Sequence, residues 1–441
     1  MSLLETGIMV WHLLRTRWGL KFASRDRLLL WQAARVAQFR HRVLTKVPLY
    51  ASYASKDPFA APVMTKESLL ANFQTSNRPG ICLNQAMKVA DQAELSRDFS
   101  PSIGDISVGL SSGTHGPRGV FLVSARERAM WAGIMLGRAL SNRHFLQLLN
   151  PLRSPLRIAF FLRANSNLYE TLKSRRIRFS FFDLFVGVDT HLAALNANQP
   201  DVLVAPARVL AYLATQQATG VLHIAPTKVI SVAEVLESDD AQRITQAFET
   251  PVHQLYQCTE GFLGYTCEEG VIHLNEEFVN VEPDWLDVAR TRFSPIITDF
   301  SRNTQPIVRY RLDDVLRVRE APCLCGRHSL ALEAIEGRCD DILWFPGAND
   351  GMQRPVFPDI VRHAFLVADL PGDYRVVQDG SILSLSCSDP SDAAHATMQS
   401  ALQGLADRLD LRLPVLARLQ WQELQWTTKR RRIVCMRRGG V

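Results

Sequence analysis

The chain has 441 residues, of which 47% are hydrophobic, and it carries a formal net charge of +6 at pH 7. This length predicts two or three domains, and the apolar content excludes a chain that is disordered over most of its length. The mild positive charge suits an anionic small-molecule ligand. The clustered basic and aromatic residues typical of a nucleic-acid-binding module are missing, so we expect no nucleic-acid partner.

The cysteines and the N-terminal stretch bear on the cellular compartment. The eight cysteines are spread unevenly along the chain, unlike those of a disulfide scaffold. The N-terminal stretch is apolar but is interrupted by Glu5, His12, Arg15 and Arg17, and no later apolar run is long enough to span a membrane. We therefore expect a cytoplasmic protein without a transmembrane segment, whose cysteines are core residues, metal ligands or catalytic thiols. The first helix has an apolar face with arginines at its edges, which leaves a peripheral membrane contact open as an alternative to ordinary helix packing.

The first part of the chain alternates helices with strands. Apolar positions recur at helical spacing within residues 1–46, and Thr65 is a helix N-cap at the start of the next helix. Continuous apolar runs bounded by turn residues are typical of buried parallel strands; they lie at 157–162, 201–206, 227–234 and 253–260, with helices at 191–197 and 208–215. This order predicts an α/β fold with a large, partly parallel sheet and crossover helices.

The pattern changes after about residue 270. Alternating polar and apolar residues there indicate antiparallel strands. The last hundred residues read as a small α+β domain with helices at 358–368 and 391–408, strands around YRVVQ, ILSLSC, 416–425 and 432–436, and a loop at 350–355. We expect an N-terminal domain over 1–339, with residues 1–46 as a helical lead-in, and a C-terminal domain over 340–441.

The segment SSGTHGPRG at 111–119 follows a predicted strand at 105–110 and is rich in glycine and hydroxyl groups. Glycines let the backbone approach a phosphate closely, and the Ser and Thr hydroxyls can donate hydrogen bonds to its oxygens. Arg118 would add a positive charge. The segment lacks the Lys-Ser/Thr of a Walker loop. Taken alone, it is equally well read as an ordinary Gly/Ser turn.

Three further motifs carry polar groups that suit a nucleotide. YQCTE ends a predicted strand, so that Tyr256 would stack on a base, Thr259 would bond a phosphate and Glu260 would hold Mg²⁺. RYRLDD at 309–314 offers a carboxylate for ribose hydroxyls, and GRCDD at 337–341 lies where the pattern changes to the last domain. Each motif alone is weak, because strand-end tyrosines are usually core residues and aspartate pairs are usually solvated.

Taken together and in this order, the motifs resemble those of the adenylate-forming superfamily of acyl-CoA synthetases, most closely its phenylacetate–CoA ligase branch. The resemblance runs from VPLY at 47–50 through SSGTHGPRG, SVAEVL, YQCTE, IVRYRLDD and GRCDDIL to TKRRRIV near the C-terminus. It implies a large adenylating domain and a small mobile C-terminal domain. It also implies ATP- and Mg²⁺-dependent conversion of a carboxylic acid to acyl-AMP, with pyrophosphate released. The acyl group would then pass to the thiol of CoA or of a carrier-protein phosphopantetheine.

The resemblance assigns roles residue by residue. Ala233 and Glu234 would line the adenine pocket, Asp314 would bind the ribose, and Asp340 would be the hinge between the domains. Lys429 would be the mobile catalytic lysine. The remaining implied nucleotide contacts are Ser111, Ser112, Gly113, Thr114, His115, Gly116, Arg118, Tyr256, Thr259 and Arg338. Of the whole set, Lys429, Glu260, Thr114 and Arg338 would be catalytic.

This sequence departs from the family pattern at several of these positions. His115 replaces the second Thr of the loop, Pro117-Arg118 replaces Lys-Pro, and Asp313 stands where a Gly precedes the ribose aspartate. Thr428 replaces the Gly before Lys429. These departures leave room for two other readings. One is a transferase that leaves AMP on a cofactor without forming a thioester, and the other is a non-catalytic nucleotide-binding scaffold.

A set of cysteine and histidine residues forms a separate signal. Cys267 and His273 are followed much later by Cys323 and Cys325, and three Cys with one His make a tetrahedral Zn²⁺ set. Four protein ligands would close the site, which would make the zinc structural. The alternative is one or two buried free cysteines.

The sequence says less about the identity of the acid than about the reaction. Phe179, Phe181, Phe182 and Phe185 would suit a flat aromatic acid, although core packing explains them better. The expected partners are the acid and a CoA or carrier-protein thiol, and a homodimer is compatible with the sequence.

Overall fold

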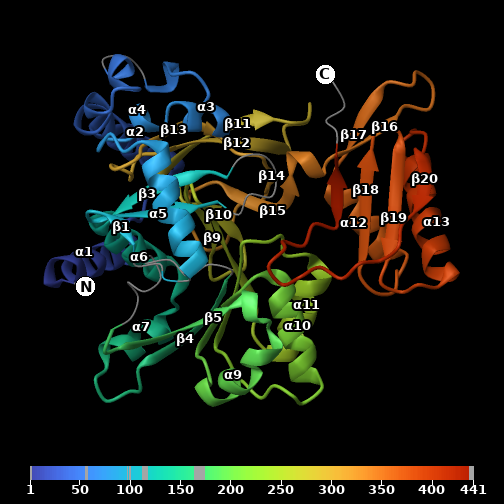
Figure 1. The fold of residues 1–441 in the computed structure, drawn as a ribbon, viewed down its shortest axis with the longest axis horizontal. Helices are drawn as coiled ribbons and strands as arrows, with labels where there is room; N and C mark the ends of the chain where they lie inside the picture. Colours follow the sequence, from blue (N-terminus) through green and yellow to red (C-terminus); the bar gives the residue numbers. More distant parts are fainter. Residues whose placement is uncertain are drawn as a thin grey trace. The chain divides into compact units, whose positions relative to one another are not determined.

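The computed structural model describes residues 2–54, 58–96, 98, 101–111, 118–162 and 174–436 (Figure 1). The chain divides into two compact units. Unit 1 comprises residues 1–285, 295–312 and 318–334, and unit 2 comprises 286–294, 313–317 and 335–441. The chain therefore passes between the units several times before it stays in unit 2.

Helices in unit 1 include two in the first 46 residues, where helical spacing was predicted. Ser2, Ser24 and Ser124 each cap a helix through the side-chain oxygen. The helices are α1 (Leu3–Leu14), α2 (Arg25–Arg42), α3 (Lys66–Ala71), α4 (Phe73–Ser76), α5 (Leu83–Ser96), α6 (Ala125–Ala139), α7 (Asn142–Leu149), α9 (Leu192–Asn198), α10 (Ala207–Ala218) and α11 (Ser238–Phe248). Within the described part of the chain, no helix is both long and apolar enough to cross a bilayer.

The central strands of unit 1 run parallel in the order β8-β7-β6-β4-β5. They are β4 (Leu156–Leu162), β5 (Ile177–Asp183), β6 (Val202–Ala205), β7 (Lys228–Val232) and β8 (Val252–Cys258). Every residue of β6 and β7 is buried, as the continuous apolar runs predicted. Helix α10 connects β6 to β7 and α11 connects β7 to β8, which confirms the α/β class.

Antiparallel strands continue this sheet beyond β8 and also form a small separate sheet. Strands β9 (Gly261–Thr266) and β10 (Ile272–Leu274) pair antiparallel after β8. The small sheet holds β1 (Ser102–Ile103), β2 (Ile106–Leu110) and β3 (Val120–Ser124). The later strands are β11 (Val279–Trp285), β12 (Arg292–Asp299), β13 (Ile307–Arg311), β14 (Asp314–Val318) and β15 (Ala331–Arg338). The predicted antiparallel texture after residue 270 is therefore confirmed.

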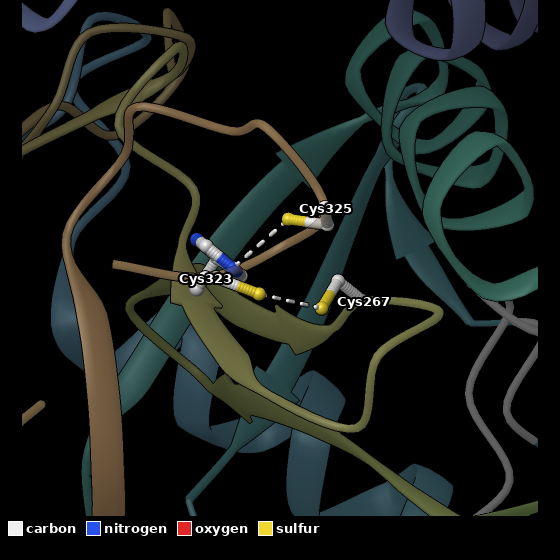
Figure 2. A group of neighbouring side chains, drawn as sticks. Cys267, Cys323 and Cys325 are labelled. Atoms are coloured by element: carbon white, nitrogen blue, oxygen red, sulfur yellow. Dashed lines mark hydrogen bonds between the residues drawn. The ribbon is translucent and has the colours of Figure 1, made fainter. Parts of the chain in front are cut away.

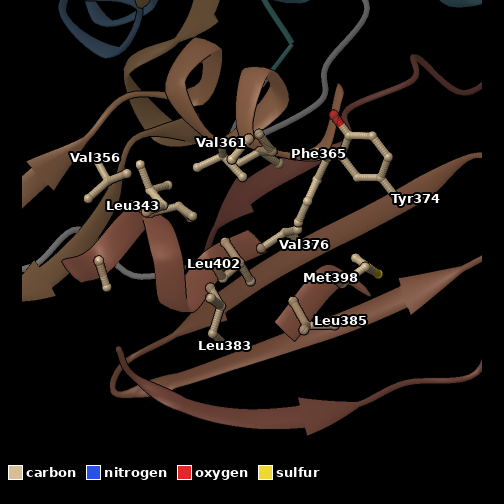
Figure 3. Packing of buried hydrophobic residues seen from close by; sticks show 14 of the residues in the cluster. Leu343, Val356, Val361, Phe365, Tyr374, Val376, Leu383, Leu385, Met398 and Leu402 are labelled. Atoms are coloured by element: carbon tan, nitrogen blue, oxygen red, sulfur yellow. The ribbon is translucent and has the colours of Figure 1, made fainter. Parts of the chain in front are cut away.

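The C-terminal part of unit 2 has its own sheet in the order β20-β19-β18-β21 and its own core (Figure 3). Its elements are β16 (Leu343–Pro346), β17 (Gln353–Val356), α12 (Pro358–Val367), β18 (Tyr374–Asp379), β19 (Ile382–Cys387), α13 (Asp392–Arg408), β20 (Val415–Arg418) and β21 (Ile433–Cys435). Alternate residues of β18 point inward, where Val376 meets Phe365 and Leu402 of the two helices (Figure 3). The prediction of a loop over 350–355 is partly wrong, because Gln353–Val356 pair with β16 as a strand.

Candidate functional site

The Gly-rich segment connects the antiparallel strands β2 and β3 of the small sheet. Ser111 and Gly119 close its base, because Ser111 N donates to Gly119 O at 2.8 Å and Gly119 N donates to Ser111 Oγ at 2.7 Å. The predicted phosphate-binding residues Ser112, Gly113, Thr114, His115 and Gly116 lie outside the described residues. The structure therefore places the two ends of this loop and no more of it.

Arg118 forms an ion pair that the sequence did not reveal. Its guanidinium donates two hydrogen bonds to the Glu94 carboxylate of α5, one of them at 2.6 Å, and a third to Ser111 O at 3.1 Å. Hydrogen bonding to Glu94 raises the pKa of Arg118 above its usual value. The positive charge of Arg118, which was predicted to face a phosphate, is thus already balanced in part by the Glu94 carboxylate of the same unit.

Two predicted nucleotide-binding segments lie at one edge of the parallel sheet. Ala233 and Glu234 follow β7, while Thr259 and Glu260 follow β8, and these neighbouring strands pair in register from Val229 with Val252 onward. The carboxyl ends of parallel strands are where ligands bind in open α/β sheets. Sequence positions 26 residues apart are therefore brought to adjacent strand ends.

The backbone at Ala233 is held in a tight turn. Its φ is 65°, and Glu234 N donates to Val232 O across it at 2.8 Å, which is the strained form of the three-residue γ-turn. The Glu234 carboxylate accepts a hydrogen bond from Arg208 N at 3.1 Å, in the first turn of α10. This carboxylate therefore satisfies a free donor of a helix N-terminus.

The YQCTE segment covers the end of β8 and the turn into β9. Tyr256 is buried in the strand, next to a register irregularity between Tyr256 and Gln257. Thr259 Oγ1 donates to Glu260 Oε2 at 2.7 Å, and both residues are half-buried. A carboxylate oriented by a neighbouring hydroxyl at a strand end can bind a divalent cation, as the sequence predicted for Glu260.

Arg302 joins this turn to strand β3, and sequence reasoning missed it. One guanidinium nitrogen donates to Thr259 O at 3.0 Å and to Glu260 O at 2.9 Å, while the other donates to Leu122 O at 3.4 Å. The residue is only 1% exposed, the largest of the fully buried side chains. A single buried cation thus fixes the predicted Mg²⁺-binding turn against the strand that leaves the Gly-rich loop.

The segment that carries Arg302 is anchored to helix α6. Glu127, in the first turn of α6, accepts hydrogen bonds from Asn303 N at 2.6 Å and Thr304 N at 2.9 Å. Burial opposes ionisation of Glu127, but the bonds from Thr304, Asn303 and Ser124 outweigh it and hold the pKa of this carboxyl below its usual value. Gln305 Oε1 accepts from Leu122 N at 2.9 Å, so both backbone groups of Leu122 are bonded to this segment.

Asp299 begins the same segment and is fully buried. It accepts hydrogen bonds from Ser301 N at 2.9 Å and Ser301 Oγ at 2.6 Å. Burial raises the pKa of Asp299 to about 6, although the nearby Arg302 guanidinium opposes the rise. A carboxyl whose pKa is raised on folding stabilises the fold while it is protonated and loses that contribution as the pH rises through its folded value.

The pH dependence of stability offers a test of this environment. We expect the free energy of unfolding of the wild type, relative to Asp299→Asn, to fall between about pH 4 and pH 6, by at most about 1.4 kcal/mol per pH unit. The variant keeps an acceptor for Ser301 but cannot ionise. Urea unfolding at a series of pH values measures the difference, and parallel curves for the two proteins would contradict it.

In unit 2, the guanidinium of the predicted site residue Arg338 lies near two others, Asp314 and Asp340, and near Asp313. Arg338 is within 3.6 Å of Asp340 Oδ1 and donates to Asp313 Oδ2 at 3.2 Å. Burial disfavours the charged form of Arg338, but the carboxylates of Asp340, Asp314 and Asp313 outweigh this and raise its pKa. The predicted ribose aspartate, nucleotide-contacting arginine and hinge aspartate are therefore neighbours.

The predicted hinge residue Asp340 also pairs with the segment that contains the predicted catalytic Lys429. Arg431 pairs with Asp340 Oδ2 at 3.1 Å and donates to the buried Asp341 through Nε at 2.8 Å. Arg432 donates to Asp373 Oδ1 at 2.6 Å and stacks over the Tyr374 ring. Lys429, two residues before Arg431, is half-buried. Ion pairs of the arginines thus define the course of this short segment.

The four residues predicted as metal ligands come together in unit 1 (Figure 2). Cys267 follows β9, His273 lies in β10, and Cys323 and Cys325 lie in the loop before β15. Their ligand atoms all lie within 4.8 Å of one another. The Cys267–Cys323 Sγ distance is 3.6 Å, and Cys325 Sγ is 3.4 Å from His273 Nε2. Tetrahedral zinc would set these edges at about 3.8 Å and 3.6 Å.

The imidazole of His273 is already oriented for coordination. Its Nδ1 bonds to Ser329 O at 3.2 Å, which leaves Nε2 facing the cysteines. A backbone carbonyl in this position fixes the tautomer of a metal-binding histidine. Cys267, Cys323 and Cys325 form no disulfide, so no such bond competes for these thiols. The donor set can therefore hold a metal ion.

The phenylalanines that would suit an aromatic acid divide between core and surface. Phe179 and Phe182 are buried in β5, where Phe182 stacks on Phe161 of β4 with ring centroids 4.7 Å apart. Phe185 is 61% exposed. The packing reading therefore accounts for the first two.

Comparisons with known proteins agree with this architecture. No family model matches the chain. Over 137 residues, the chain is 31% identical to indoleacetate–lysine synthetase from Pseudomonas savastanoi; the match covers 30% of this chain and 33% of that enzyme. The chain thus spans about a third of the length of this curated relative.

Solved structures match over nearly the whole chain. The first is 2-hydroxyisobutyryl-CoA ligase in the postadenylation state with R3-HIB-AMP, with a TM-score of 0.64 and 16% identity, covering 96% of this chain and 92% of that one. The second is an open conformation of that ligase with 2-HIB-AMP and CoA, with a TM-score of 0.54 and 17% identity, covering 91% and 90%. The fold is that of adenylate-forming ligases, and the resemblance predicted from the motifs is confirmed at this level.

Proposed function

We propose that this protein uses ATP to activate a carboxylic acid as its acyl-AMP in the cytoplasm and then transfers the acyl group to a thiol. The observation that carries the proposal is the contact made by Arg302. It holds the Thr259–Glu260 turn, which the motifs assigned to the nucleotide, against the strand that follows the Gly-rich segment. The fold shared with acyl-adenylate-binding ligases supports the same assignment.

The chemistry requires two anions to meet. A carboxylate oxygen attacks the α-phosphorus of ATP, the bond from that phosphorus to the bridging oxygen breaks, and pyrophosphate leaves with the electron pair. The protein must align the reactants and offset their repulsion. Glu260 would hold Mg²⁺, which supplies positive charge to the phosphates. Thr114 and the loop backbone would donate hydrogen bonds, and Lys429 would add a cation where charge develops.

Transfer follows in a second step. The thiolate sulfur attacks the acyl carbonyl of the adenylate, and AMP leaves with the electron pair of the broken C–O bond. The Asp340 hinge would let the C-terminal domain remove Lys429 and admit the thiol. Arg338, between the carboxylates of Asp313 and Asp340, would contact the nucleotide from the same segment.

The proposal also concerns the identity of the acceptor and of the acid. An amine is a second candidate acceptor, because the name of the curated relative describes joining an acid to lysine. That name also describes an aromatic acid, and it favours an aromatic substrate here. A transferase that leaves AMP on a cofactor, or a scaffold without catalysis, would give a different assay pattern.

The test is ATP–pyrophosphate exchange with purified protein and a panel of aromatic, aliphatic and amino acids. We expect exchange with at least one aromatic acid, followed by acyl transfer to CoA or a holo carrier protein. Transfer to free lysine instead would assign an amine acceptor. ATP binding without exchange for any acid would favour the scaffold, and AMP transfer to a non-acid cofactor would favour the adenylyltransferase.

We further propose that Cys267, His273, Cys323 and Cys325 bind one structural Zn²⁺. Their ligand atoms all lie within 4.8 Å of one another, the Cys267–Cys323 and Cys325–His273 separations are close to tetrahedral edges, and four protein ligands leave no open position for catalysis. The ion would tie the β9–β10 hairpin to the loop before β15.

Removing this metal is expected to loosen unit 1. Cys325→Ser should purify with less zinc and melt about 10 °C lower than the wild type, because metal binding contributes directly to folding. Elemental analysis and thermal unfolding measure the two effects. Cys82→Ser, which changes an exposed cysteine outside the cluster, is the matched control. A wild type that contains no metal, and whose melting temperature added zinc does not change, would refute the assignment.

A further inference from the structure

Helix α1 continues into a π-helical turn, η1 (Arg15–Gly19), and one face of this segment is fixed to helix α6. Met9, Leu13 and Thr16 are buried there. On α6, Gly133 lies against the carbonyl of Met9 and Gly137 against that of Leu13; a Cβ at Gly133 would collide with the α1 backbone, and one at Gly137 would be crowded against it. The two helices are therefore in close backbone contact, and the orientation of α1 on unit 1 is set.

The opposite face of this segment is apolar and exposed. Its large side chains are Leu3 (94% exposed), Leu4 (73%), Val10 (43%), Trp11 (62%), Leu14 (41%) and Trp18 (46%). At 100° per residue these positions, with Gly7 among them, fall on one arc of the helix. A continuous exposed apolar stripe that includes two tryptophans indicates an interaction surface.

The surroundings of the stripe are positively charged. Arg15, Arg17 and Lys21 lie at its C-terminal end, while Glu5 is the acidic residue of α1. Arg126 and Arg128 of α6 do not belong to this border, because the residues they interact with electrostatically, His12 and Glu5, lie on the side of α1 away from the stripe. An apolar stripe with tryptophans and a basic border is the pattern of helices that lie in the interface of an anionic bilayer.

Charge decides between the two main occupants. A second copy of the chain docked in the same direction along this stripe would bring its own arginines and Lys21 to the same end, where like charges repel. An anionic lipid surface would instead supply the opposite charge. We propose that the exposed face of Leu3–Gly19 binds the surface of an anionic membrane, with the apolar side chains at the headgroup boundary and the helix parallel to the bilayer.

The test is co-sedimentation of the full chain with phosphatidylcholine vesicles that contain or lack phosphatidylglycerol. We expect binding to the anionic vesicles alone, weakened by high salt. The double variant Trp11→Ser/Trp18→Ser should lower the binding about ten-fold or more. Lys21→Glu, at an exposed position, should lower it severalfold at low salt. The double variant Leu152→Ser/Val288→Ser changes apolar residues elsewhere that are even more exposed, and it should bind as the wild type does.

Results of two kinds would overturn the proposal, the first from vesicle binding and the second from the oligomeric state. One is wild-type protein that stays in the supernatant with anionic vesicles, or a tryptophan double variant that still binds while its thermal unfolding is unchanged. The other is a dimer, seen by analytical ultracentrifugation without lipid, that the tryptophan variant dissociates, since a second copy would then cover the stripe.

Discussion

Arg302→Met is expected to reduce acid-dependent ATP–pyrophosphate exchange about a hundred-fold. The guanidinium donates to Thr259 O, Glu260 O and Leu122 O, and methionine fills similar volume while donating to none of them. Charge-assisted bonds to buried carbonyls are worth roughly 1.5–3 kcal/mol each. Losing them would let the turn that carries Glu260 move relative to β3. A misplaced catalytic carboxylate costs about 3 kcal/mol in the transition state.

This variant must be distinguished from one that is merely unfolded. Exchange should be measured well below its melting temperature, per folded molecule, with the dependence on Mg²⁺ concentration recorded. A positioning role predicts that the variant needs more Mg²⁺ and that Arg302→Lys, which keeps the charge, recovers part of the rate. Arg138→Met removes another fully buried arginine, the partner of Glu277, and should lower stability without this Mg²⁺ effect. Equal Mg²⁺ dependence in Arg302→Met and wild type would refute the positioning role.

Lys429→Ala should cause a comparable or larger loss of acyl-AMP formation with little change in ATP affinity. The proposed role of the ammonium is to offset charge that develops as pyrophosphate leaves, so its removal should act on the transition state rather than on binding. Pyrophosphate exchange measures the rate, and titration calorimetry with ATP measures the affinity.

Lys429 is the first of four consecutive basic residues, so its variant must be compared with a variant of one of the arginines that follow it. Arg431→Ala breaks the pairs with Asp340 and the buried Asp341, so we expect it to lower the stability of unit 2. Lys429→Ala should instead lower exchange in a protein that is still folded. Wild-type exchange in Lys429→Ala would show that the lysine was assigned wrongly, and the same panel would then be applied to the neighbouring arginines.

Much of the fold follows from local patterns. Strands β6 and β7 are recognisable because buried parallel strands are apolar on both faces, and α13 is marked by Ser391 as its N-cap. The Cys and His residues were also recognisable, since few other roles explain Cys323-Leu-Cys325 with an earlier Cys and His. Strand β17 was missed because QRPV is polar and contains proline, and only its pairing with β16 makes it a strand.

The rest of the site depends on contacts between distant residues. Arg302 lies in Ser-Arg-Asn-Thr between two strands, a segment whose composition reads as a loop. Its acceptors are backbone carbonyls, which leave no trace in the sequence. Glu94, 24 residues before Arg118, likewise gives no local sign that it will pair with that arginine. The resemblance named residues by their order in the motifs, whereas their partners come from tertiary packing.

The turn at Ala233 restricts how this protein can change. With φ at 65°, the position disfavours β-branched and bulky side chains, and the carboxylate that follows it is committed to the start of α10. Selection for a new substrate would therefore find few usable substitutions here. Libraries that vary this strand end should return alanine, glycine or asparagine, and altered specificity should arise from the side chains of adjoining elements.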